Sequence, residues 1–147
     1  MKIYNKRANF NFDLEKERVE VGLSLLGMEA KSLRDGRGDI SLAFIKSLNG
    51  ELYLINANIP VQNAVDYNPT RPRKLLLHKS QITSLLTKIK TSKLAIVPVK
   101  MYNKRRLVKL ELALGKPKRK FEKKEAIKKK DIELDMKREL RGEEINK

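Results

Sequence analysis

Apolar and polar residues alternate with a period of two along much of the first 115 positions of this 147-residue chain. Phe10, Phe12 and Leu14 alternate with polar residues, and the same pattern returns over residues 19–25. Alternation of this kind predicts half-buried strands, because successive side chains of a strand point to opposite faces of a sheet. We therefore expect two strands in this part of the chain.

Two longer stretches predict β-hairpins. Residues 43–48 and 51–59 flank Asn49-Gly50, a dipeptide that tolerates the positive φ angles of a type I′ turn. A second hairpin is expected over residues 94–114, where the strands flank a basic tip at residues 103–106.

Two other stretches have the period of amphipathic helices. Residues 26–34 bring three apolar side chains to one face, and Gly36 is placed to end that helix. Residues 79–90 bring four apolar side chains to one face, with Ser80 as the expected N-cap. The apolar positions are Leu26, Ala30, Leu33, Ile82, Leu85, Leu86 and Ile89.

These elements together predict a mainly β fold. About six short antiparallel strands with two or three short helices are typical of an OB-fold-like closed antiparallel barrel, a fold that binds nucleic acids on an open face. An SH3-like barrel is the alternative architecture.

Charge divides the chain into two parts. The sequence has 34 Lys and Arg against 18 Asp and Glu, a net charge of +16. Residues 1–115 hold nearly all the β-branched and aromatic residues, whereas the segment after Pro117 is a run of lysines. We expect an RNA-binding body over residues 1–115 and a basic tail over 116–147, since such a run is hard to pack. A charge of this size makes a polyanion the expected partner.

The sequence also argues against several classes of function. It has no cysteine and one histidine, which excludes disulfide scaffolds, Cys-ligated zinc and thiol nucleophiles. His78 has no partner motif and is interpreted as a satisfied or solvent-facing side chain. No phosphate-binding glycine motif, spanning apolar segment or secretory signal is present. We expect a cytoplasmic protein that is not an enzyme, with no catalytic residue, metal, cofactor or membrane partner.

Basic clusters are the most informative feature of the chain. They lie at residues 6–7, 71–74, 104–106 and 116–130, outside the predicted strands or at their edges. Aromatic residues are few, whereas proteins that bind single strands use many as stacking platforms. This combination favours a structured RNA recognised through its backbone and shape.

Several motifs resemble those of one family. Four segments are distinctive: residues 5–8, Gly27-Met28-Glu29-Ala30-Lys31-Ser32-Leu33-Arg34, the segment from Asn68 to Lys79, and residues 108–114. In their order and spacing they resemble motifs of the small protein B (SmpB), or SsrA-binding protein, family. Lys116 to Lys130 is similar to that family's basic tail. The resemblance covers nearly the whole chain.

The resemblance implies an OB-fold adaptor of trans-translation. Such a protein binds the tRNA-like domain of transfer-messenger RNA and delivers it to stalled ribosomes, where its tail probes the empty mRNA channel near the decoding region of the small subunit. We expect a monomer. A general OB-fold RNA-binding or ribosomal protein is the alternative function, and composition alone does not separate the two.

The resemblance also implies which residues bind. The expected RNA-binding residues are Asn5, Lys6, Arg7, Glu20, Glu29, Lys31, Arg34, Arg71, Arg73, Lys74 and Lys109. The expected ribosome-binding tail residues are Lys118, Arg119, Lys120, Phe121, Glu122, Lys123, Lys124, Lys128, Lys129, Lys130, Ile132, Met136 and Leu140. Glu20 cannot attract phosphate, so it either accepts from base amino groups or 2′-hydroxyls, or orients a neighbouring Lys or Arg.

The tail has a helical period of its own. Ile132, Met136 and Leu140 are spaced i, i+4, i+8 on one helix face, a stripe too narrow to fold alone in water. We expect the tail to be disordered when free and helical on the ribosome; the alternative is a disordered extension with accidental periodicity. The chain departs from the family pattern at Asn9, Phe10, Pro117, Glu122 and Ile132.

Overall fold

The computed structural model describes residues 1–118, and Met1–Pro117 forms one compact unit. Of the predicted ribosome-binding tail residues, only Lys118 belongs to this part. The others lie outside the described residues, and so does the predicted helical stripe from Ile132 to Leu140. The division into body and tail stays a prediction.

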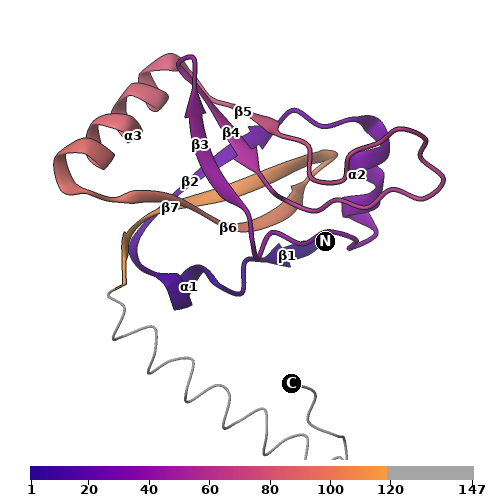
Figure 1. Ribbon diagram of the computed structural model, residues 1–147, viewed down its shortest axis with the longest axis horizontal. Helices are drawn as coiled ribbons and strands as arrows, with labels where there is room; N and C mark the ends of the chain where they lie inside the picture. Colours follow the sequence, from indigo (N-terminus) through magenta and orange to yellow (C-terminus); the bar gives the residue numbers. More distant parts are fainter. Residues whose placement is uncertain (119–147) are drawn as a thin grey trace, which may run out of the picture. The chain divides into compact units, whose positions relative to one another are not determined.

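Seven antiparallel strands form one sheet, and three helices accompany them within residues 1–118 (Figure 1). The strands are β1 (Lys2–Tyr4), β2 (Phe12–Leu23), β3 (Phe44–Leu48), β4 (Glu51–Ile55), β5 (Arg73–Leu76), β6 (Ala95–Lys104) and β7 (Leu107–Pro117). The helices are α1 (Ala8–Asn11), α2 (Gly27–Arg34) and α3 (Lys79–Ser92). Helices α2 and α3 lie at opposite ends of the sheet (Figure 1). The expectation of a mainly β antiparallel fold is confirmed.

The sheet is open, so the expectation of a closed barrel is wrong on this point. The strand order is β1-β6-β7-β2-β5-β4-β3, and within residues 1–118 its two end strands, β1 and β3, do not pair with each other. Within this part of the chain β1 pairs with β6 alone and β3 with β4 alone, so each end strand leaves one edge without a strand partner.

One long strand replaces the two that the alternation predicted near the start of the chain. Strand β2 pairs with β7 along its length, and an irregularity between Leu14 and Arg18 shifts the register. The polar stretch that looked like a break between two strands is therefore a bulge. Phe10 belongs to the single helical turn α1, in which the Asn11 amide donates to the Arg7 carbonyl oxygen at 2.9 Å.

Both predicted hairpins are present. Asn49 and Gly50 have φ angles of 52° and 77°, the pair of positive values that a type I′ turn requires. The second hairpin joins β6 to β7, and its tip is shorter than expected. Because Lys104 pairs with Leu107, only Arg105 and Arg106 form the turn.

Both predicted helices are also present. Helix α2 ends before Gly36, whose φ of 78° and hydrogen bond from its amide to the Leu33 carbonyl oxygen (2.9 Å) close the helix. Helix α3 has His78, not Ser80, as its N-cap, and the His78 amide donates to the Gln81 side chain at 3.0 Å. His78 is exposed, as the sequence indicated.

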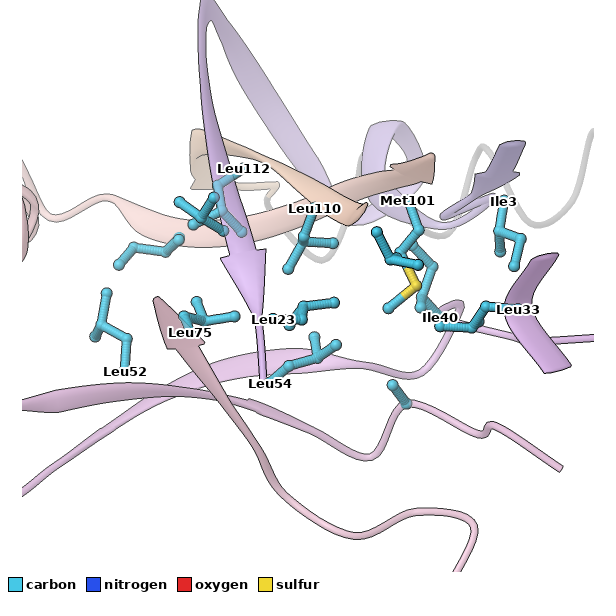
Figure 2. Close-up of a cluster of buried hydrophobic side chains, with 14 of the residues drawn as sticks. Ile3, Leu23, Leu33, Ile40, Leu52, Leu54, Leu75, Met101, Leu110 and Leu112 are labelled. Carbon is cyan, nitrogen blue, oxygen red and sulfur yellow. The ribbon is translucent and has the colours of Figure 1, made fainter. Parts of the chain in front are cut away.

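The core lies on the inner face of the curved sheet. Val21 and Leu23 of β2 point inward beside Leu110 and Leu112 of β7, and Leu33 of α2 closes one end. Figure 2 shows this cluster together with side chains from β4, β5 and β6. Since side chains alternate along a strand, the residues between these leucines point outward and form the polar face described below.

No helix within residues 1–118 is long and apolar enough to cross a membrane.

We expect Gly50→Ala to destabilise the protein by about 1 kcal/mol, because an L-residue with a Cβ is disfavoured at positive φ. No atom lies within 4 Å of a Cβ built on Gly50, so the cost comes from the backbone alone. Chemical denaturation at neutral pH measures it.

Gly27→Ala is the matched control. A Cβ there also meets nothing within 4 Å, but Gly27 is in the first turn of α2 with no positive φ. This exchange should leave stability unchanged or raise it by about 0.5 kcal/mol. Equal losses from both exchanges would show that the turn geometry does not set the cost.

Candidate nucleic-acid interface

The outward-facing residues of β2, β7 and β6 form a charged surface across three neighbouring strands. The register places Glu20 directly opposite Glu111, and it places Lys109 opposite both Gly22 and Tyr102. We call this surface the outer charged face. It consists of Arg18, Glu20, Lys100, Tyr102, Lys104, Lys109 and Glu111.

Glu20 uses both of its carboxylate oxygens within the protein. The Tyr102 hydroxyl donates to Oε2, and Lys104 Nζ lies 3.3 Å from Oε1. The hydrogen bond from Tyr102, followed by that from Lys104, lowers the pKa of Glu20. Desolvation and the neighbouring Glu20 raise the pKa of Tyr102 to about 12, so its hydroxyl keeps its proton at neutral pH.

Glu111 contacts two further cations of this face. Its carboxylate lies 3.4 Å from Arg18 and 3.2 Å from Lys100, whose ammonium is 5.5 Å from the centroid of the Tyr102 ring. Like charges directly opposite on paired strands repel each other. Here the surrounding cations offset the repulsion between Glu20 and Glu111 and leave the face with an excess of positive charge.

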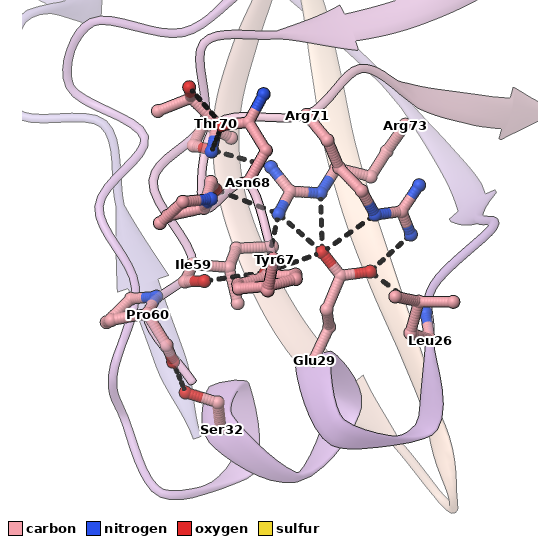
Figure 3. Close-up of polar contacts among 12 residues, drawn as sticks. Leu26, Glu29, Ser32, Ile59, Pro60, Tyr67, Asn68, Thr70, Arg71 and Arg73 are labelled. Atoms are coloured by element: carbon pink, nitrogen blue, oxygen red, sulfur yellow. Dashed lines mark hydrogen bonds and ion pairs between the residues drawn. The ribbon is translucent and has the colours of Figure 1, made fainter. Parts of the chain in front are cut away.

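A different arrangement surrounds Glu29, whose side chain is 0% exposed. Arg73 Nε donates to Glu29 Oε2 at 2.9 Å, and Arg71 Nε donates to the same oxygen at 3.2 Å (Figure 3). The Tyr67 hydroxyl donates to Oε2 at 2.8 Å, and the Leu26 amide donates to Oε1 at 2.9 Å. Although desolvation acts against it, the hydrogen bonds from Arg71, Leu26 and Arg73 lower the Glu29 pKa to about 2.

Two of the predicted RNA contacts are therefore buried. Arg73 is also 0% exposed, and its guanidinium further donates to the carbonyl oxygens of Ala57 (2.6 Å) and Pro69 (2.9 Å). In this structure Glu29 and Arg73 have no surface to offer an RNA, so the expectation that they contact RNA does not fit. The charged partners of Glu29, Arg71 and Arg73, come from beyond α2.

The remaining predicted residues near this cluster stay accessible. The Arg71 side chain is 29% exposed, and Lys31 and Arg34 lie on the exposed side of α2. Lys74 of β5 is exposed beside Glu51, with 3.8 Å between Nζ and Oε1. Its neighbour Leu76 faces Gly22 across the strand pair and is also exposed, which extends the outer face with an apolar edge.

The turn between β1 and α1, away from the cluster around Glu29, contains Asn5, Lys6 and Arg7. The Asn5 side chain donates to the Pro98 carbonyl oxygen at 2.7 Å and accepts from the Arg7 amide at 3.0 Å, so it fastens this turn to β6. Lys6 and Arg7 are exposed, and their charge helps to lower the pKa of Asp39, after its larger hydrogen bonds with Ser41. The structure does not bring these residues together with Glu20.

Most residues of the outer charged face lie outside the set that the family resemblance predicted to bind RNA. Of its residues only Glu20 and Lys109 were expected to bind, whereas Arg18, Lys100, Tyr102, Lys104 and Glu111 were not. Strand register is the signal that could have found them. Pairing the predicted strand around Glu20 with the second hairpin puts these residues on one face.

Comparison with known proteins agrees with this geometry. The family model described as SmpB protein matches residues 2–142. An SsrA-binding protein of Afipia carboxidovorans is 44% identical over 142 residues, which cover 94% of this chain and 90% of the relative. That of Thermosipho melanesiensis is 42% identical over 142 residues, covering 94% and 96%. A chain from a solved structure described as "tmRNA-SmpB: a journey to the center of the bacterial ribosome" is 38% identical, with a TM-score of 0.66, covering 86% of this chain and 94% of that chain.

The fold and the outer charged face define a mainly β protein with a cationic surface. The matched family model and these identities go further: the chain belongs to the SmpB protein family.

We expect Glu29→Gln to destabilise the protein by about 3–5 kcal/mol, because it leaves the buried Arg73 guanidinium without an anion. Denaturant unfolding measures the loss. Glu51→Gln, which removes an exposed pair with Lys74, is the control and should cost at most about 1 kcal/mol. Equal costs for the two exchanges would contradict the role of burial.

The loss should also depend on pH. The pKa of Glu29 is lowered from 4.5 to about 2 on folding, so its contribution is complete above pH 4.5 and disappears as the pH falls towards 2. The stability difference between wild type and Glu29→Gln should therefore shrink across this interval.

Proposed function

We propose that this protein is an RNA-binding adaptor of trans-translation. It binds the tRNA-like domain of transfer-messenger RNA and delivers that RNA to stalled ribosomes. Membership of the SmpB family supports the proposal, and so do its relatives, which are named SsrA-binding proteins. The similarity to a chain in the solved structure described as tmRNA-SmpB supports it as well. The outer charged face is the observation in the structure that carries it.

The charges of that face suit a folded RNA. Arg18, Lys100, Lys104 and Lys109 provide cations at spacings fixed by the strands, and Lys74 and Leu76 of β5 continue the surface. A rigid array of cations matches phosphates whose positions are fixed by RNA structure. Arg71, Lys31 and Arg34 provide further exposed cations near α2.

Several finer features belong to the same proposal. The open, curved sheet is an OB-fold-like RNA-binding body. The protein works as a monomer in the cytoplasm, where its ribosomal partner is. The role is that of an adaptor rather than an enzyme, and it requires no cofactor and no metal.

The basic tail completes the adaptor. In this proposal the residues after β7, 118–147, follow the empty mRNA channel of the small subunit through their lysines and become ordered there. The Ile132, Met136 and Leu140 stripe then forms one face of a helix.

Sequencing of the RNA that copurifies with the protein separates this function from the alternative. One dominant RNA with a tRNA-like domain supports the adaptor, whereas a broad mixture supports a general RNA-binding or ribosomal protein.

We expect binding to the tRNA-like RNA to weaken steeply with salt. If about five phosphates are neutralised, log affinity should fall with a slope of about −4 against log salt concentration. Titrations of labelled RNA at several salt concentrations measure this slope. A slope near zero would reject the cationic surface as the interface.

We expect deletion of residues 118–147 to abolish rescue of stalled ribosomes and to reduce RNA affinity only modestly. The strands and core lie within Met1–Pro117, so the truncated protein should stay folded. Addition of the tag to stalled chains is the activity measured. Full tagging by the truncated protein would reject the role of the tail.

Scrambling residues 131–141 at constant composition is the companion variant. If charge alone matters, tagging persists; if the helical stripe matters, tagging is lost.

A further inference from the structure

Glu20 and Tyr102 form one unit on the outer charged face. The Tyr102 hydroxyl donates to one oxygen of Glu20, and Lys104 occupies the other at 3.3 Å. Each carboxylate oxygen of Glu20 therefore already has one partner within the protein. Of the two roles that a carboxylate could have here, orienting its neighbours fits these contacts better than accepting directly from a base.

The oxygen of the Tyr102 hydroxyl can still accept a hydrogen bond. A tyrosine hydroxyl donates one hydrogen bond and accepts others, and the donated one goes to Glu20. Lys100 lies 5.5 Å from the ring centroid, and β6 fixes the backbone, so the ring is held from two sides. Lys104 contacts Glu20 at 3.3 Å, and Lys109 lies directly opposite Tyr102 on β7, so both lysines belong to the same part of the face as this hydroxyl.

We propose that the Tyr102 hydroxyl accepts a hydrogen bond from a ribose 2′-hydroxyl of the bound RNA, and that Glu20 is a positioning residue that holds Tyr102 and Lys104 for this contact. The chemistry is that of an RNA backbone: a 2′-hydroxyl donates to the tyrosine oxygen, and the phosphates on either side meet Lys104 and Lys109. This inference rests on the proposed RNA-binding function and names the contact within it.

The first experiment is a double-mutant cycle on affinity for a transcript of the tRNA-like domain. Glu20→Gln and Tyr102→Phe should each weaken binding about fivefold. The RNA affinity of the double variant should be at most about twofold below that of the single variant with the lower affinity, because both exchanges remove the same contact. Glu20→Gln binding as tightly as wild type, or losses that multiply in the double variant, would overturn the proposal.

Glu17→Gln is the matched control. Glu17 also lies on β2, is 84% exposed and is 4.0 Å from Lys88 of α3, so it has no contact with Tyr102. It removes the same charge, and a cationic protein with one fewer anion should bind RNA equally well or slightly more tightly. A loss equal to that of Glu20→Gln would show that the effect does not depend on the contacts of Glu20, and would overturn the proposal. Thermal unfolding of each variant establishes that it is folded.

The second experiment identifies the atom on the RNA. Transcripts with a single 2′-deoxy nucleotide at successive positions are tested against wild type and Tyr102→Phe. At one position or more, loss of the 2′-hydroxyl should weaken RNA binding by the wild-type protein about fivefold and leave RNA binding by Tyr102→Phe unchanged. If every deoxy position weakens the two proteins equally, the proposed contact is rejected. Failure of wild type itself to bind the transcript would instead reject the proposed function.

Discussion

A single buried carboxylate holds one end of this fold together. Glu29 at the start of α2 accepts hydrogen bonds from Tyr67 and Arg71, which lie in the irregular segment between β4 and β5, and from Arg73, the first residue of β5. Burying an arginine is expensive unless an anion compensates it, so this segment has one favourable path past the helix. That path leads into β5 and sets its register beside β2, which places Lys74 and Leu76 next to the outer charged face.

Two glutamates that the family motifs assigned to the same task therefore have different tasks. Glu29 is fully buried, and its charge is neutralised within the fold, whereas Glu20 lies on the sheet surface with partners from β6. The difference arises from position along the elements. Glu29 is on the face of α2 that packs against the protein, and Glu20 alternates with the inward-facing Val19 and Val21. A motif preserves the residue type but does not say which side of the sheet or helix the residue occupies.

The sequence was sufficient where structure is local. Asn49-Gly50 fixed a hairpin, and the apolar periods of α2 and α3 fixed two helices to within two residues, because those signals depend on neighbours in the chain. Partners far apart were not predictable in this way. Arg71 and Arg73 are 42 and 44 residues from Glu29, and Tyr102 is 82 residues from Glu20. Short β1 and β5 were missed for the same reason, since they form only by pairing with distant strands.

The carboxylates on the surface that we propose to bind RNA lower its net charge, and their presence there has a physical reason. Lysines alone repel one another and sample many rotamers, so each contact with a phosphate costs side-chain entropy. Glu20 and Glu111 each hold two partners in place, which exchanges some non-specific attraction for a fixed arrangement of cations. An adaptor that must select one folded RNA among many benefits from this exchange, because attraction to phosphate is shared by every RNA whereas fixed geometry is matched by few.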